Sequence, residues 1–182
     1  MIKKNLIFLV GFMGAGKSTI GLRLARDLKW NFIDLDQEIE KGEGRPIRQI
    51  FSEKGESYFR QLETKVLQGL KTRGPSVIAL GGGAFIQDIN RLLIHELGYS
   101  VFLDCALEVI VKRCPQDGTR PLLHSSGGLE ALYTSRLPYY QKSDFRVDVS
   151  NQSPEQITKT ILDHLSAGRI DDAHNINRPV DI

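Results

Sequence analysis

The sequence predicts an α/β protein in which helices cover both faces of a parallel β-sheet. Short runs of apolar and β-branched residues recur along the chain, at 6–10, 31–35, 76–80, 99–104 and 145–149. The segments between them repeat apolar residues at every fourth position, as at Ile20, Leu24 and Leu28. Strands that alternate with helices favour parallel pairing through right-handed crossovers. Nearly continuous apolar strands are typical of a sheet that is buried on both faces.

Composition indicates one globular domain and excludes several classes of partner. The chain has 182 residues, of which 41% are hydrophobic and 25% are charged. Its net charge of +2 is spread along the chain, which gives no support to nucleic-acid binding. No window approaches the roughly 20 apolar residues of a membrane span. Cys105 and Cys114 fit buried or incidental thiols in a reducing cytosol, with no disulfide framework, so we expect a soluble cytoplasmic protein.

Two segments depart from the strand–helix alternation. Residues 114–128 are rich in proline, glycine and polar residues, which predicts a mobile excursion from the fold. Residues 168–182 are polar and aperiodic, which predicts a disordered tail. We therefore expect a single domain over residues 1–167.

The stretch GFMGAGKSTIG, residues 11–21, follows the first predicted strand and matches G-x-x-x-x-G-K-[ST]. Glycines let successive N–H groups point at phosphate oxygens, and the following helix adds the positive end of its dipole. A lysine can reach the β- and γ-phosphates, and a serine hydroxyl can bind Mg²⁺. The alternative is a tight strand–helix turn without a ligand. The residues predicted to bind a nucleoside triphosphate are Gly14, Ala15, Gly16, Lys17, Ser18 and Thr19.

The guanine-reading pattern N-K-x-D is absent from the chain, which disfavours a GTP switch.

At the end of the second predicted strand, Asp34 and Asp36 stand two positions apart and are expected to share one face. Ligands of open α/β sheets bind at this end of the strands. Two neighbouring carboxylates need a cation or a proton donor between them, such as Mg²⁺ or an acceptor hydroxyl. The alternative is that Asp36 only caps a helix that begins at Gln37.

Several further residues are ambiguous by themselves. Arg60 and Glu63 lie one helical turn apart, and spacing alone favours a solvated ion pair. Arg136 has no distinctive context, whereas Arg120 lies in the excursion, from which a closing loop could bring it to a transferring phosphate. Glycines 81–83 follow a strand, which predicts either close approach of a ligand or a flexible turn.

Together these motifs identify a family. GFMGAGKSTIG, FIDLD, FRQLE, GGG, TRPLL and Arg136 shortly before Pro-Tyr-Tyr occur in this order between residues 6 and 165. In order and spacing they resemble shikimate kinase. The resemblance implies a nucleoside-monophosphate-kinase-like P-loop core, three-layered α/β/α, with a five-stranded sheet of order 2-3-1-4-5 and a lid at about 114–128. It also implies ATP-dependent phosphorylation of the shikimate 3-hydroxyl, in the biosynthesis of chorismate and the aromatic amino acids.

The same resemblance implies roles for individual residues. Shikimate is expected to contact Asp36, Arg60, Gly82 and Arg136, with the two arginines holding its carboxylate. Mg²⁺ is expected at Ser18 and Asp34, the aspartate acting through water. Arg113 and Pro154 are expected to sandwich the adenine, although helix capping alone explains Ser153 and Pro154. The implied catalytic residues are Lys17, Asp36 and the lid residue Arg120, which would contact both phosphate and acceptor.

Two alternatives to this activity stay open on the sequence. One is another small-molecule kinase, acting on gluconate or on a nucleoside monophosphate. A monophosphate would bring about two negative charges to Asp36, which is unfavourable without more arginines. The other is a nucleotide-binding regulator without enzymatic activity. We expect a monomer, with no nucleic-acid or membrane partner.

Overall fold

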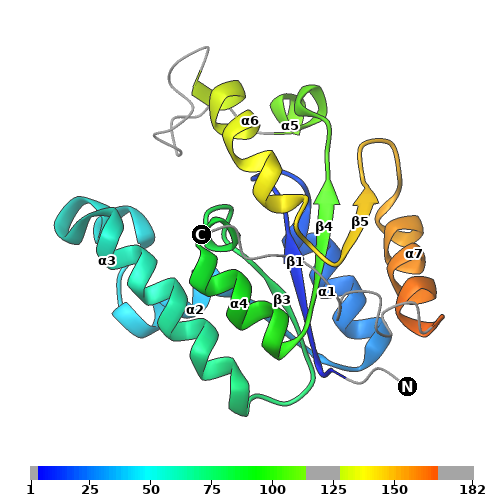
Figure 1. Ribbon diagram of the computed structural model, residues 1–182, viewed down its shortest axis with the longest axis horizontal. Helices are drawn as coiled ribbons and strands as arrows, with labels where there is room; N and C mark the ends of the chain where they lie inside the picture. Colours follow the sequence, from blue (N-terminus) through cyan, green and yellow to red (C-terminus); the bar gives the residue numbers. More distant parts are fainter. Residues whose placement is uncertain (1–3, 114–127, 168–182) are drawn as a thin grey trace.

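The computed structural model describes residues 4–113 and 128–167 (Figure 1). The predicted mobile excursion, with Arg120 and Cys114, lies outside the described residues except for Gly128. The predicted disordered tail, residues 168–182, also lies outside them.

The described residues form a five-stranded sheet in the order β2-β3-β1-β4-β5, and every pairing is parallel. Both the predicted fold class and the strand order implied by the resemblance are confirmed. The central strand β1 pairs with β3 on one side and with β4 on the other. The strands are β1 (Leu6–Val10), β2 (Asn31–Asp34), β3 (Ser76–Ala79), β4 (Tyr99–Asp104) and β5 (Phe145–Asp148).

Helices flank this sheet and connect its strands (Figure 1). Helix α1 packs against α7, whereas α3 packs against both α2 and α4. The helices are α1 (Lys17–Leu28), α2 (Leu35–Glu43), α3 (Ile47–Gly69), α4 (Asp88–Leu97), α5 (Leu107–Arg113), α6 (Gly128–Tyr140) and α7 (Pro154–Ser166). Two short 3-10 turns, η1 (Leu70–Thr72) and η2 (Ala84–Ile86), follow α3 and β3.

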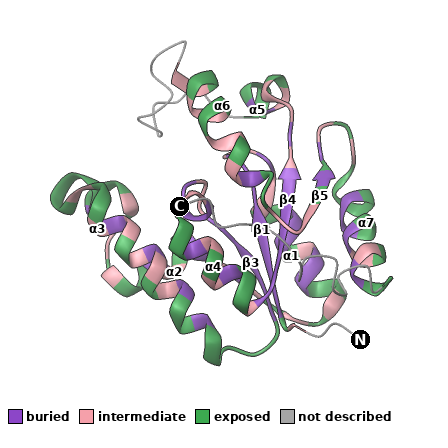
Figure 2. Cartoon of the chain, in the orientation of Figure 1, coloured by how far each residue is buried: buried purple, intermediate pink, exposed green. Residues whose placement is uncertain are grey.

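Burial explains the apolar character of the strands. Every residue of β1 and β3 is buried, because helices cover both faces at the centre of the sheet (Figure 2). The edge strand β5 buries only Val147 and leaves Arg146 and Asp148 exposed. Since parallel strands place their carboxyl ends at the same edge, the segments after β1, β2 and β3 converge there.

Helix α3 is interrupted at Gly55, whose backbone has φ 78° and ψ 174°. This positive φ suits glycine, which has no Cβ to clash with the preceding carbonyl. A Cβ built at Gly55 would meet no atom within 4 Å, so a side chain here would be opposed by the backbone conformation and not by packing. The part of α3 after Gly55 carries Arg60 and Glu63.

Candidate active site

The phosphate-binding loop joins β1 to α1 and exposes backbone N–H groups at the start of the helix. Gly14 and Gly16 have backbone φ angles of 77° and 92°, values that residues other than glycine rarely adopt. Gly16 is the N-cap of α1, and no side chain caps the helix there. The first turn of α1 contains no acidic residue. This arrangement leaves the positive end of the helix available to an anion.

Lys17 folds back over this loop. Its Nζ donates to the carbonyl oxygens of Gly11 and Phe12, each at 2.8 Å. The backbone N–H of Ala15 also donates to Phe12 O, at 3.3 Å, which closes the turn. The ammonium group is therefore held on the same loop that presents the N–H groups.

Asp34 is the N-cap of α2. Its Oδ1 accepts from the backbone N–H groups of Asp36 and Gln37, at 3.1 and 3.4 Å. Its Oδ2 accepts from Ser18 Oγ at 2.9 Å. The prediction that both aspartates lie on the strand is wrong, and so is the alternative that Asp36 caps a helix from Gln37. Aspartate is strongly favoured as an N-cap, so Asp34 starts the helix at Leu35 and places Asp36 in its first turn.

Asp36 lies against the glycine turn that follows β3. A Cβ built at Gly81 would come within 2.5 Å of Asp36 Oδ1 and within 3.3 Å of Glu63 Oε1. Glycine at this position therefore leaves room for two carboxylates to approach the turn. A side chain at Gly81 would displace Asp36.

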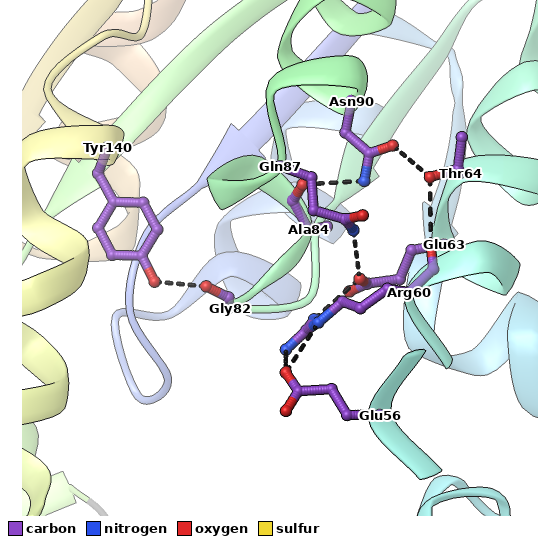
Figure 3. A network of polar contacts seen from close by, with 9 residues as sticks. All are labelled: Glu56, Arg60, Glu63, Thr64, Gly82, Ala84, Gln87, Asn90 and Tyr140. Atoms are coloured by element: carbon purple, nitrogen blue, oxygen red, sulfur yellow. Dashed lines mark hydrogen bonds and ion pairs between the residues drawn. The ribbon is translucent and has the colours of Figure 1, made fainter. Parts of the chain in front are cut away.

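Arg60 and Glu63 form an ion pair in which the carboxylate is buried and the guanidinium is partly exposed, which corrects the prediction of a solvated pair. Arg60 Nη1 donates to Glu63 Oε2 at 2.8 Å, and the Glu63 side chain is 0% exposed. Arg60 also donates from Nε and Nη2 to Glu56 Oε1, at 3.1 and 2.8 Å (Figure 3). Helical spacing cannot reveal this burial, because the cover comes from α4 and η2, later in the chain.

The charged side chains around Arg60 and Glu63 shift one another's pKa. Burial raises the pKa of Glu63 to about 7, and the Asp36 carboxylate adds to the rise, although Arg60 opposes it. Burial disfavours the Arg60 cation, but the carboxylates of Glu63 and Glu56 outweigh it and raise the pKa of Arg60. Arg60 is therefore a permanent cation held between two acidic side chains.

A polar network ties this cluster to the following segments (Figure 3). Gln87 Nε2 donates to Glu63 Oε2 at 3.1 Å. Thr64 Oγ1 donates to Asn90 Oδ1 at 2.7 Å, and Asn90 Nδ2 donates to Ala84 O at 3.0 Å. Sequence reasoning missed Gln87, Thr64 and Asn90, and no local motif marks them.

Arg136 reaches the same glycine turn from α6. Its Nη1 lies 3.2 Å from the position of a Cβ on Gly82, which is also 3.9 Å from Met13 N in the phosphate loop. The Arg136 guanidinium lies over the Phe12 ring, 5.9 Å from its centroid. At Gly83 a Cβ would clash with the Arg60 guanidinium. Three consecutive glycines thus accommodate Asp36, Arg136 and Arg60 in turn, so the turn is packed against side chains.

The residues expected around adenine are less closely connected. Pro154 is the first residue of α7, where Ser153 and Gln156 form a capping box, so the predicted cap is confirmed. With residues of α1 that include Thr19, Pro154 lines an open hollow. Arg113 Nη1 donates to Cys105 Sγ at 3.7 Å. Within residues 4–113 and 128–167 no recorded contact joins Arg113 to Pro154.

No described helix has both the length and the apolar character needed to cross a bilayer. Among the described residues, no three His, Cys, Asp or Glu side chains form a group able to hold a metal ion.

Comparison with known proteins identifies the family. The family model for shikimate kinase matches residues 13–166. The chain belongs to the shikimate kinase family. A shikimate kinase from Persephonella marina is 43% identical over 157 residues, which are 86% of this chain and 96% of that protein. The resemblance found in the sequence motifs is confirmed, and the chain is an ATP-using enzyme of the shikimate pathway with shikimate kinase activity.

Solved structures agree with this assignment. Shikimate kinase from Aquifex aeolicus superposes with a TM-score of 0.82 at 38% identity, covering 92% of this chain and 99% of that one. The enzyme from Acinetobacter baumannii, solved in complex with shikimate, gives a TM-score of 0.85 at 35% identity, covering 93% and 97%. A gluconokinase from Sinorhizobium meliloti, at 20% identity and a TM-score of 0.57, shares the fold.

Proposed function

We propose that the chain transfers the γ-phosphoryl group of ATP to the 3-hydroxyl of shikimate, giving shikimate 3-phosphate and ADP. The observation that carries this proposal is the turn at residues 81–83, against which Asp36, Arg136 and Arg60 each pack. A carboxylate and two guanidinium groups around one turn suit an acceptor that has both a hydroxyl and a carboxylate. The same turn approaches Met13 N, so the acceptor lies beside the phosphate loop.

On this proposal, the triphosphate binds to residues 14–19, through the side chain of Lys17 and through backbone N–H groups other than that of Ala15, which donates to Phe12 O. The ammonium already lies 2.8 Å from two loop carbonyls, so a phosphate oxygen gains a nearby cation with little rearrangement. Arg113 and Pro154 hold the adenine. The hollow lined by Pro154 supports the contact of the adenine with Pro154, but it does not include Arg113.

Ser18 and Asp34 fit a Mg²⁺ site. Their oxygens lie 2.9 Å apart, and hydroxyl and carboxylate oxygens are ligands that Mg²⁺ accepts. Mg²⁺ commonly takes only one or two protein ligands and completes its shell with water and phosphate, so a larger acidic cluster is not required. Bound there, the ion supplies charge neutralisation for the phosphates. Asp34 Oδ1 continues to cap α2 while Oδ2 faces Ser18.

In the transfer step, Asp36 orients the 3-hydroxyl of shikimate and accepts its proton as the oxygen bonds to phosphorus. Arg60 and Arg136 hold the shikimate carboxylate, which fixes the ring relative to Asp36. Lys17 neutralises charge that develops on the phosphoryl oxygens. We assign the same task to Arg120, in a lid at about 114–128, outside the described residues.

The acceptor dependence of ADP release tests this function. We expect shikimate, but neither gluconate nor AMP, to stimulate ADP formation by the purified chain. Turnover with AMP alone would contradict the proposed acceptor. ATP binding without any acceptor-stimulated ADP would indicate a regulator. The Asp36→Asn variant, purified in parallel, controls for contaminating kinases.

We further propose that the enzyme is a monomer and acts in the cytoplasm. The chain has two cysteines, too few for a disulfide framework, and Cys105 is buried, which suits a reducing compartment. Light scattering after size-exclusion chromatography tests the oligomeric state.

A further inference from the structure

Helix α6 presents two side chains to the same glycine. Arg136 and Tyr140 are four residues apart, so they lie on one face of the helix. A Cβ on Gly82 would lie 3.2 Å from Arg136 Nη1 and 3.7 Å from Tyr140 Oη. Arg136, which we propose to hold the shikimate carboxylate, and Tyr140 therefore meet at one backbone position.

The Tyr140 hydroxyl donates a hydrogen bond to Gly82 O at 2.5 Å (Figure 3). The side chain is 1% exposed, and its ring packs on Phe102 with centroids 5.5 Å apart. Burial raises the pKa of Tyr140 to about 12, although the Arg136 guanidinium opposes the rise. The hydroxyl thus keeps its proton, and with it its donor role, throughout the neutral range.

This hydrogen bond fixes the direction of the following peptide group. In a planar trans peptide the carbonyl and the next N–H point in opposite directions, so holding Gly82 O orients Gly83 N–H away from Tyr140. In the described part of the chain, no acceptor is recorded for the N–H of Gly82 or of Gly83. Gly82 approaches the Arg136 guanidinium and Gly83 approaches that of Arg60, so these two donors belong to a backbone segment flanked by both cations.

We propose that Tyr140 is a positioning residue for shikimate. Its hydroxyl holds the Gly82 carbonyl, so that the two glycine N–H groups and the Arg136 guanidinium form a single binding surface for the acceptor. Tyr140 acts through the backbone and through α6, without touching the reacting atoms. The inference rests on the proposed function, because it requires shikimate to bind at this turn.

A purely structural role makes a different prediction. Any buried tyrosine hydroxyl needs an acceptor, and Gly82 O would satisfy it whether or not a ligand binds nearby. Loss of the hydroxyl would then lower thermal stability and leave the KM for shikimate unchanged. A positioning role changes the KM for shikimate and spares the KM for ATP.

The test is the Tyr140→Phe variant, which keeps the ring packed on Phe102 and removes only the donor. We expect the KM for shikimate to rise about five- to fiftyfold, since an unpaired buried carbonyl and a loosened turn weaken binding. The kcat and the KM for ATP should change less than about twofold. Calorimetric titration of shikimate without ATP should show the same loss of affinity.

Tyr139→Phe is the matched control. Tyr139 is the preceding residue of α6, and its ring lies under the guanidinium of Arg91, 5.2 Å away, a contact that phenylalanine retains. This variant should match the wild type in both KM values. A wild-type KM for shikimate in Tyr140→Phe, or an equal rise in both KM values, would overturn the inference alone. A wild type without shikimate-dependent ADP release would overturn the proposed function and the inference with it.

Discussion

The loop at residues 11–16 and the turn at residues 81–83 both follow buried strands of one sheet, but they are built from different parts of the chain. The loop uses a contiguous segment, whose positive-φ glycines and helix start expose N–H groups. The turn is a meeting point for side chains from α2, α3 and α6. The comparison teaches that one half of the site is encoded locally and the other half by tertiary packing.

The substitution with the largest expected effect changes Asp36, beside the turn at residues 81–83, and leaves the loop at residues 11–16 intact. We expect Asp36→Asn to lower kcat by about 10²–10⁴, because the amide cannot accept the proton of the hydroxyl. The KM for ATP should stay near the wild-type value. Steady-state kinetics with both substrates provides the measurement. Asp163→Asn, at an exposed site on α7, is the control, and near-normal kcat in Asp36→Asn would refute the proposed role.

Arg136→Ala tests the binding of the carboxylate. Loss of charge-assisted hydrogen bonds should raise the KM for shikimate about 10- to 100-fold, with the KM for ATP unchanged. Arg136→Lys keeps the charge but loses the planar fork, so it should recover only part of the affinity. An unchanged KM for shikimate in the alanine variant would place the carboxylate elsewhere.

The phosphate loop can be weakened separately through its backbone. Gly16 has φ 92°, where an alanine costs about 1–2 kcal/mol, so Gly16→Ala should raise the KM for ATP about tenfold. The KM for shikimate should stay at the wild-type value in Gly16→Ala. Gly42→Ala is the contrasting control: it lies in α2 with no atom within 4 Å of its Cβ position, and should stabilise the fold by about 0.5–1 kcal/mol. Equal changes in the KM for ATP in Gly16→Ala and Gly42→Ala, or an equal rise in both KM values in Gly16→Ala, would contradict the independence of the loop and the turn.

The smallest expected effect concerns the pH dependence of stability. The pKa of Glu63 is about 7 in the folded chain, against an ordinary value of 4.5. The folded state therefore holds this proton more tightly, which contributes stability below pH 4.5 that is lost as the pH rises through about 7. Glu63→Gln cannot ionise and should not show this loss.

Thermal melts from pH 5 to pH 8 measure the difference. Relative to Glu63→Gln, the wild type should lose about 1–3 kcal/mol, or a few degrees in Tm, across this interval. The exposed Glu96, paired with Lys71 at 3.0 Å, supplies the control substitution Glu96→Gln. Parallel Tm curves for wild type and Glu63→Gln would contradict the raised pKa.

The same contrast explains what was predictable. Strands, helices and the phosphate loop follow from local periodicity and a contiguous motif. The position of Asp36 was misjudged because strand continuation and N-capping compete at Asp34, and capping prevailed. The hydrogen bond from Gln87 to Glu63 spans 24 residues, and the contact of Tyr140 with Gly82 spans 58. Such contacts leave no periodic signal, so the resemblance to a family, rather than spacing, pointed to the residues that we propose to bind the acceptor.

The break at Gly55 has a consequence for how this site tolerates change. In a continuous helix, adding one residue rotates everything beyond it by about 100°, since the helix has 3.6 residues per turn. A left-handed residue at position 55 resets that rotation before Arg60 and Glu63. A change of length between Ile47 and Gly55 would therefore disturb the packing of the buried Ile50 before it altered the helical phase of Arg60. The orientation of Arg60 toward Gly83 is thus set by the residues after the break, independently of the helical phase of the segment before it.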